Sequence, residues 1–405
     1  MLRYLLFTFL PLFSMAQSVD PNNALLWEIS GNGLEQPSYV FGTYHSNDSR
    51  LFNFSDSTYF ALNNADMISL ETDVFSMADT WDVRMNSLKI KYDNEGNPYV
   101  SDPNATETIY GDEDGRPQFL DAYFQQYCYN AEKEFYPLET VDFQQNLLID
   151  WGIPDFRRVN LSSFLMSKDL MIETYLKGDI YKLDEMLRGS LAMYTQGYKK
   201  LIIDRNVDMA DQIIELIPEN RLFCAVGAGH LPGTGGVLNL LRKAGYTIRK
   251  VTASYSDEMI EEKREVLSVR NYVYSNDLLG MTIEFPGKPK VIEQDNDDAE
   301  VRLSYRDFGQ GNTYEVQVYR RGSEIGLKDL AQMYIPSPSE SPFAKIELQN
   351  GGEAYEGIAD SYPEGIYWTR IIMSEDYFVI MKAYGGNKFM NSQRAQKFFD
   401  RVQFQ

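Results

Sequence analysis

The chain has 405 residues, a formal net charge of −21, two histidines and two cysteines. A field this acidic repels nucleic acids and anionic membrane surfaces, so nucleic acid is not an expected partner. The length is typical of two domains. Two cysteines are too few for a disulfide framework, although an oxidising compartment would permit one bridge between Cys128 and Cys224.

The first 16 residues have the pattern of a secretory signal peptide. Arg3 supplies a positive charge, residues 4–13 are mostly apolar, and the small residues Ser14 and Ala16 precede a cleavage site before Gln17. The apolar stretch is too short to cross a bilayer, and no later segment approaches the roughly 20 apolar residues that a membrane helix needs. We therefore expect an exported protein, periplasmic or secreted, with no transmembrane segment once the signal is removed.

Residues 17–260 combine short apolar strands with helices. Near-continuous apolar segments of strand length occupy 36–45, 66–73, 221–226 and 246–251. A helix from Thr234 to Ala244 separates the last two, and the sequence between 120 and 217 is mostly helical. Such strands joined by helices are typical of a buried parallel sheet. We expect an α/β domain with a central, largely parallel sheet flanked by helices.

A turn-rich stretch between residues 85 and 120 carries Asp112, Glu113 and Asp114 beside Gly115. An EF-hand would need alternating oxygen ligands and a distal glutamate, and this loop has neither. The loop is therefore expected to be a surface turn rather than a calcium site.

Residues 270–405 have a different pattern, with short alternating segments at 281–285, 300–305, 314–320, 344–348, 366–373 and 377–383. Helices are expected near 326–334 and 387–402, and a charged linker within 254–275. The pattern predicts a separate α+β domain with a mostly antiparallel sheet. It contains neither histidine nor cysteine, so we expect an accessory or binding module.

Both histidines end a similar four-residue turn, Gly42-Thr43-Tyr44-His45 and Gly227-Ala228-Gly229-His230. Histidine is the commonest metal ligand and the side chain whose ordinary pKa is nearest to neutrality. The second turn lies between a strand and a helix, where a dinucleotide fingerprint would lie. Pro232 occupies the position of the third glycine of that fingerprint, so a nucleotide site is not expected.

His45, Glu71 and His230 each lie at the end of a short apolar strand. The carboxyl ends of parallel strands share one edge of a sheet, so these side chains are expected to converge there. Two imidazoles and a carboxylate form a suitable set for a catalytic divalent metal. Glu71 is either a third ligand or the general base that accepts a proton from water, and the sequence leaves both roles open. Asp48 and Asp73 are weaker candidates for the same site.

Several ordered motifs resemble the TraB/GumN family. The resemblance covers about 24–253 and includes the strand before each histidine. The matching segments are Leu26–Gly31, Pro37–His45, Ala65–Glu71, Leu138–Thr140 with Gln144, Asp204–Asn206 with Met209, and Val226–Gly233.

That family is similar to the Tiki proteins, membrane-tethered metalloproteases with paired Gly-x-x-His motifs and an active-site glutamate. The resemblance implies metal-site roles for His45, His230 and Glu71, and supporting catalytic roles for Arg205 and Asn206. It also implies manganese or cobalt as the metal, with zinc as an alternative. From the helical pattern alone, Arg205 and Asn206 would be expected on a charged face toward solvent.

Two further comparisons concern the edges of this resemblance. The family often has glutamate before its Arg-Asn pair, where this chain has Asp204. The start of the C-terminal domain, Phe285–Pro289, is similar to small exported α+β domains of the PsbP/Mog1 kind.

These features predict an exported, divalent-metal-dependent hydrolase acting on a peptide or protein. In that prediction, Arg205 stabilises the developing oxyanion. Two alternatives stay open. One is a non-catalytic protein that binds and sequesters peptides, and the other is a metal-dependent hydrolase of another ester or amide.

Overall fold

The structure is a computed structural model that describes residues 24–46, 48–76, 120–143, 168–191, 197–256, 261–269 and most of 272–404. Within 272–404, the described part leaves out 278, 293–298, 308–311, 322–325, 335–342, 349–352, 362–364, 375, 386 and 391. The predicted signal peptide and the turn-rich stretch of 85–119 lie outside the described residues.

The N-terminal domain is built on a six-stranded sheet of order β4-β3-β5-β2-β1-β6. Its strands are β1 (Leu26–Ser30), β2 (Ser38–Thr43), β3 (Met67–Thr72), β4 (Glu134–Glu139), β5 (Leu222–Gly227) and β6 (Thr247–Lys250). The pairs β2–β5, β5–β3 and β3–β4 are parallel. All residues of β2 and β3 are buried, as expected for a parallel sheet covered on both faces.

One strand departs from the expected parallel arrangement. β1 runs antiparallel to both of its neighbours, β2 and β6. The cause is the tight turn after β1, in which Gly31, Asn32 and Gly33 have φ values of 78°, 49° and 88°. Glycine and asparagine tolerate this left-handed conformation, which reverses the chain into a hairpin. The prediction of a largely parallel sheet is confirmed, with β1 as the exception.

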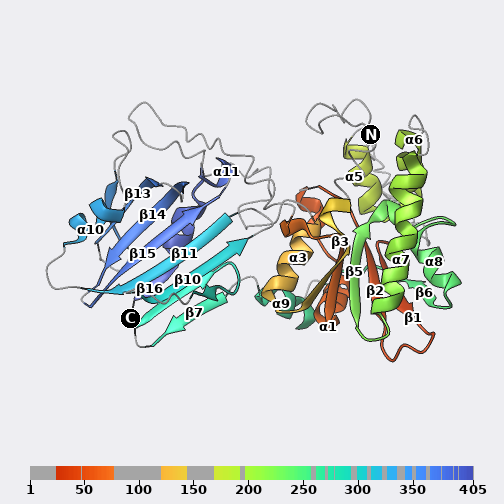
Figure 1. The fold of residues 1–405 in the computed structure, drawn as a ribbon, viewed down its shortest axis with the longest axis horizontal. Coiled ribbons are helices and arrows are strands. Elements are labelled where there is room, and N and C mark those ends of the chain that lie inside the picture. The colour runs from red at the N-terminus through yellow and green to blue at the C-terminus, as the bar shows by residue number, and fades with distance from the viewer. Residues whose placement is uncertain are drawn as a thin grey trace, which may run out of the picture.

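Helices cover both faces of this sheet. They are α1 (Asp56–Asn64), α3 (Leu120–Asn130), α5 (Lys168–Leu176), α6 (Ile180–Leu191), α7 (Arg205–Leu216), α8 (Val237–Lys243) and α9 (Glu261–Ser268). Figure 1 shows α1, α3 and α9 on one side of the sheet and α7 and α8 on the other. Short helical turns at Ser49–Phe52 (η1) and Ala228–His230 (η4) and a π-helix at Lys199–Asp204 (η3) complete the domain.

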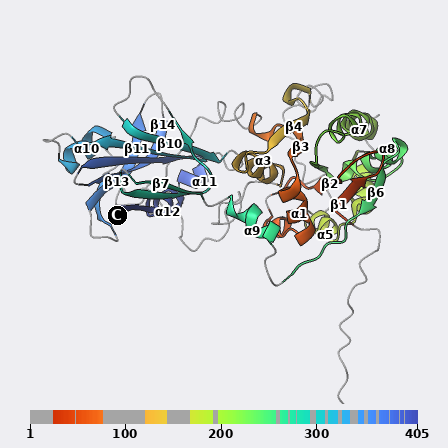
Figure 2. The same ribbon diagram turned by 90° about the horizontal axis from the view of Figure 1, so that it is seen from below.

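The C-terminal domain contains antiparallel sheets, in agreement with the α+β prediction. One has the order β12-β13-β14-β15-β11-β10-β9 and the other the order β16-β8-β7. The strands are β7 (Tyr272–Asn276), β8 (Met281–Phe285), β9 (Lys290–Val291), β10 (Ala299–Asp307), β11 (Asn312–Arg320), β12 (Ala344–Glu347), β13 (Glu353–Ser361), β14 (Gly365–Met373), β15 (Tyr377–Tyr384) and β16 (Val402–Phe404). The helices are α10 (Leu327–Tyr334), α11 (Asn387–Met390) and α12 (Arg394–Phe399). Figure 2 shows this domain beside the N-terminal one.

Three expectations for the second half of the chain need correction. The helix expected over 387–402 is two short helices followed by β16, because the chain ends by pairing with β8. The expected linker contains α9, which packs near α1 through a 2.5 Å hydrogen bond from Asn63 to Glu265. The alternation pattern missed β13, whose place between β12 and β14 is decided by tertiary pairing.

The two cysteines are both buried and unbridged. Cys224 is inside β5, and the Cys128 thiol donates to the carbonyl oxygens of Lys133 and Glu134, each at 3.3 Å. The bridge that export would permit is therefore not formed. In the part of the chain that the structure describes, no helix combines the length and the apolar character needed to span a bilayer.

Candidate functional site

The three predicted residues converge at the carboxyl edge of the central strands. His45 lies just after β2, Glu71 is the penultimate residue of β3, and His230 follows β5. These strands are neighbours, and the turn at Gly227 marks where the side chains meet. A Cβ added to Gly227 would lie 3.3 Å from His230 Cδ2, 3.5 Å from Glu71 Oε2 and 3.9 Å from His45 Nε2. The absence of a side chain at Gly227 therefore keeps open the point where the three groups approach each other.

The ring of His230 is buried and its tautomer is defined by Asn206. His230 Nδ1 lies 2.7 Å from Asn206 Oδ1, while the amide nitrogen of Asn206 donates to the Gly235 carbonyl oxygen at 2.8 Å. Because a carbonyl oxygen only accepts, Asn206 must present its own oxygen to His230, so Nδ1 carries the proton. Burial lowers the pKa of His230 to about 4, so the ring is neutral near pH 7 with Nε2 unprotonated. This is the form of histidine that binds a metal.

The ring of His45 is more exposed and is held by a charged partner. Its Nδ1 lies 2.9 Å from Oδ2 of Asp121, a buried residue in the first turn of α3. The other oxygen of Asp121 accepts a hydrogen bond from Thr43 Oγ1 at 3.2 Å. The Asp121 charge raises the pKa of His45 to about 9. In the metal-free protein, His45 is therefore protonated at neutral pH, and a bound cation would have to displace the Nε2 proton.

Glu71 is a buried, ionised carboxylate, contrary to the surface position that is usual for glutamate. Its Oε1 accepts a hydrogen bond from Arg205 Nη2, and its Oε2 accepts the Gly227 N–H at 3.3 Å. Burial acts to raise the pKa of Glu71, but the positive charge of Arg205, followed by those of the two histidines in their protonated forms, outweighs burial and holds this pKa well below its usual range. His230 Nε2 lies 3.8 Å from Glu71 Oε1.

Arg205 links two buried carboxylates. Its Nε and Nη2 donate to the two oxygens of Glu139 at 2.7 and 2.8 Å, and its Nη1 donates to the Leu201 carbonyl oxygen at 3.1 Å. Arg205 and Asn206 both face inward from the start of α7, so the expectation of a solvent-facing pair is wrong. The reason is packing, because the same face of α7 carries Met209, which is fully buried.

Sequence reasoning gave no role to two residues of this cluster, Asp121 and Glu139. Glu139 ends β4, so the strand-end rule that identified Glu71 applies to it equally. Asp121 follows no strand, and nothing local in the sequence marks it. The two weaker candidates have other partners: Asp48 pairs with Arg50 at 2.8 Å, and Asp73 accepts hydrogen bonds from the turn that follows it.

Asp204, the departure from the family pattern, also lies apart from this cluster. Its carboxylate oxygens accept hydrogen bonds from Lys199 Nζ at 2.6 and 2.9 Å, on the exposed side of the π-helix. The carboxylate at this position is therefore paired with Lys199.

The donor set suits a divalent metal, although the described residues hold no group of three or more His, Cys, Asp or Glu already arranged around a metal position. Two features suit a divalent ion. Each imidazole has its Nδ1 held by an acceptor, and the open space at Gly227, here called the cradle, lies between the two rings. An acceptor on the far ring nitrogen is the usual support for a metal-binding histidine. His45, His230 and, through its free lone pairs, Glu71 would hold the ion, with solvent or substrate filling the remaining positions.

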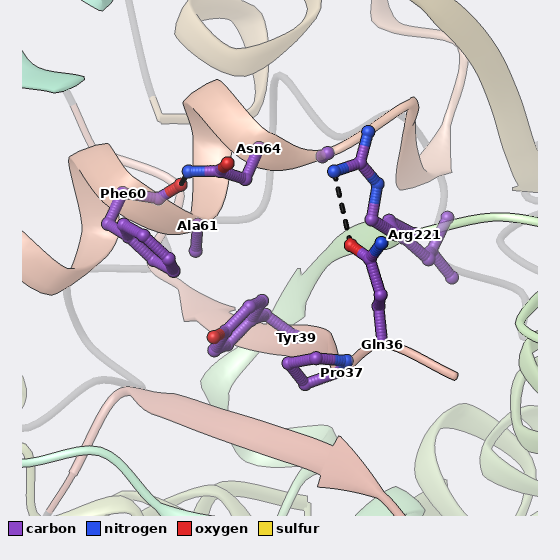
Figure 3. Close-up of a pocket in the computed structure, with 9 residues that line it drawn as sticks. Gln36, Pro37, Tyr39, Phe60, Ala61, Asn64 and Arg221 are labelled. Atoms are coloured by element: carbon purple, nitrogen blue, oxygen red, sulfur yellow. Dashed lines mark hydrogen bonds between the residues drawn. The ribbon is translucent and has the colours of Figure 1, made fainter. Parts of the chain in front are cut away.

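A small pocket of about 70 Å³ lies at the opposite, amino-terminal edge of the same strands. Figure 3 shows Tyr39 and Pro37 on one side of it, Phe60 on another, and a hydrogen bond between Arg221 and Gln36 at its rim. Since β2 and β5 separate it from the histidines, this pocket is not part of the candidate site.

Comparisons with known proteins agree with the N-terminal motifs. The model of the TraB/PrgY/gumN family matches residues 25–96 and 104–250. No curated protein matches the chain. Among solved structures, the chain is similar to the PsbP protein CyanoP of Synechocystis sp. PCC 6803 at 11% identity and a TM-score of 0.26, covering 38% of this chain and 98% of that one. It is also similar to the Ran-binding protein Mog1p of Saccharomyces cerevisiae at 9% identity and a TM-score of 0.24, covering 34% and 96%. At these TM-scores neither likeness supports an argument about function.

Proposed function

The chain belongs to the TraB/PrgY/gumN family, and from that premise we propose that it is an exported, divalent-metal-dependent hydrolase that cleaves peptide bonds. The observation that supports this proposal best is the meeting of His45, His230 and Glu71 around Gly227. The chemistry rests on the donor set, the peptide substrate on the family resemblance, and export on the pattern of the first 16 residues.

Each residue of the cluster has a distinct task in this proposal. His45 and His230 present Nε2 to the ion, since Asp121 and Asn206 hold the other ring nitrogens. When bound, the divalent ion supplies a Lewis acid that polarises a substrate carbonyl and acidifies water. The open cradle at Gly227 leaves room for the substrate to approach.

The electrostatics of Glu71 favour one of the two roles that the sequence left open. An efficient general base has a pKa near the working pH, whereas Arg205 holds the pKa of Glu71 far below it. A carboxylate in that state is a fixed anion that attracts and binds a cation. We therefore assign Glu71 to metal binding, and not to proton abstraction while Arg205 holds it.

The contacts of Arg205 suggest a different task from oxyanion stabilisation. Its guanidinium is buried and donates to Glu71, Glu139 and the backbone. Oxyanion stabilisation needs donors aimed at the substrate. In our proposal Arg205 positions Glu71 instead, and Glu139 orients Arg205.

Metal analysis combined with peptide digestion tests this function. The purified full chain is supplied in turn with manganese, cobalt and zinc, and then incubated with a peptide library. We expect retained metal and cleavage in the wild type, and loss of both in His45→Ala and His230→Ala. Glu71→Gln should lose cleavage, whereas Asp48→Asn, a carboxylate outside the cluster, should retain it.

Each other outcome has a definite meaning. Absence of bound metal under every supply, or metal binding as strong in both histidine variants as in the wild type, would overturn the proposal. Retention of uncleaved peptide would favour a sequestering protein. Turnover of esters or non-peptide amides alone would keep the metal chemistry and replace the substrate class.

A further inference from the structure

We propose that Asp121 is a positioning residue: it holds a proton on Nδ1 of His45, so that the nitrogen that loses its proton to bind a metal is Nε2, which faces the open space at Gly227. This inference rests on the proposed function, because it concerns the atom that would bind the metal. Two contacts in the structure support it. Asp121 Oδ2 lies 2.9 Å from His45 Nδ1, and Asp121 Oδ1 accepts from Thr43 Oγ1 at 3.2 Å.

The need for such a residue follows from the unequal burial of the two histidines. The side chain of His230 is 7% exposed, so its surroundings hold the ring in place. The side chain of His45 is 59% exposed and lies beyond the end of β2, in irregular chain. An exposed ring has more freedom to rotate, so a specific hydrogen bond must hold it.

Asp121 is well placed to provide this hold. It is buried in the first turn of α3, a helix that packs against β3, and the Thr43 hydroxyl fixes the orientation of its carboxylate. Thr43 is the last residue of β2, so one carboxylate joins the end of the strand to the ring two positions later. The carboxylate only accepts, and therefore requires a proton on His45 Nδ1.

The partner of His230 shows how the roles of charge and acceptor can be separated. Asn206 holds that ring with a neutral amide oxygen, whereas Asp121 holds His45 with a charged carboxylate. In Asp121→Asn the amide oxygen can still accept from His45, and the amide nitrogen can donate to the Thr43 hydroxyl. This variant therefore keeps the acceptor and removes the charge.

The chain offers a clean spectroscopic test, because its two histidines contain only four ring nitrogens. Nitrogen NMR of the metal-free full chain, labelled at histidine, reports each tautomer directly. The spectra are recorded at a pH above the His45 pKa of about 9, so that both rings are neutral. We expect His45 to be protonated at Nδ1 in the wild type and in Asp121→Asn. In Asp121→Leu, which has a similar shape and no acceptor, the proton should move largely to Nε2.

Manganese affinity, measured by calorimetry, provides the second readout. Loss of a residue that supports a metal ligand typically weakens binding about 10- to 100-fold, so we expect this range for Asp121→Leu and a smaller loss for Asp121→Asn. Thr43→Val is the matched control, since it removes the other hydrogen bond of Asp121 and leaves the imidazole contact. Its tautomer should match that of the wild type.

The result that would overturn the inference is an unchanged His45 tautomer in Asp121→Leu, which would leave Asp121 a purely structural link between α3 and β2. Asp121→Leu leaves the Thr43 hydroxyl without its acceptor. If this variant does not fold, the double variant Thr43→Val/Asp121→Leu, which also removes that hydroxyl, serves in its place. If the wild type binds no metal, the proposed function fails, while the NMR comparison still decides whether Asp121 sets the tautomer.

Discussion

Removal of the positive charge at Arg205 should destabilise the N-terminal domain strongly. Arg205 is buried between the carboxylates of Glu71 and Glu139, which are buried as well. Arg205→Met keeps most of the aliphatic volume and removes every donor. The variant therefore leaves two negative charges inside the protein with no cation to compensate them.

The expected loss follows from the contacts. Removing one partner of a buried ion pair costs about 3–5 kcal/mol, because the remaining charge is left unpaired and poorly solvated. Here one guanidinium serves two carboxylates, so we expect the upper half of that range, about 4–5 kcal/mol. Glu139→Gln is the matched control, because its amide oxygen still accepts from Arg205 and the remaining pair, Arg205 with Glu71, is neutral. That change should cost about 1–2 kcal/mol, as for one weakened hydrogen bond to a charged group.

Urea denaturation of the metal-free protein at pH 7, monitored by hydrogen exchange of the β5 amides, measures the free energy of unfolding of this domain. The deficit of Arg205→Met should also shrink in acid. Since the wild-type pKa of Glu71 is depressed, the stability that this pairing contributes is present above the ordinary glutamate pKa of 4.5 and is lost as the pH falls below it. A loss below about 1 kcal/mol, or a loss equal to that of Glu139→Gln, would refute the reasoning about buried charge.

Three further predictions concern the cradle, the pH response and the thiols. Gly227→Ala puts a methyl group where the two imidazole rings meet. Calorimetry should show manganese binding weakened by about tenfold or more, with little change in melting temperature. An unchanged affinity would contradict the idea that the metal binds in the open space at Gly227. Asp121 raises the pKa of His45 to about 9. The stability that the Asp121–His45 pair contributes to the metal-free protein is therefore complete below pH 6.5 and is lost as the pH rises through 9. The stability difference between wild type and Asp121→Asn should therefore shrink over that range in urea titrations, and a constant difference would argue against this pairing. Burial raises the pKa of the Cys128 and Cys224 thiols to about 12, so a thiol reagent at pH 8 should label neither thiol in the folded protein. After unfolding without reductant, the reagent should label both thiols. Labelling of one thiol or of neither after unfolding would indicate a modified or bridged cysteine.

Much of this architecture was predictable from local sequence. The apolar segments containing β2, β3 and β5 are strands because continuous apolar runs of that length suit a sheet buried on both faces. Parallel neighbours end at one edge, so strand-end placement alone indicated that His45, Glu71 and His230 would meet. Each of these inferences uses residues that are close in the chain or a general rule of sheet geometry.

The partners of these residues were decided only by the tertiary structure. Asp121 lies 76 positions from His45, Arg205 lies 134 positions from Glu71, and Glu139 lies 66 positions from Arg205. No periodicity or turn pattern links residues so far apart, because their contact depends on strand order and on which helix covers which face. The inward direction of Arg205 has the same origin.

The sequence by itself therefore determined which side chains lie at the ends of the central strands, since strand formation and glycine turns are local properties of the chain. The tertiary structure decided the charge and tautomer of those side chains, since both depend on burial and on hydrogen-bond partners from distant segments. That division leaves His230 neutral beside Asn206 and His45 charged beside Asp121, although both histidines end the same four-residue motif.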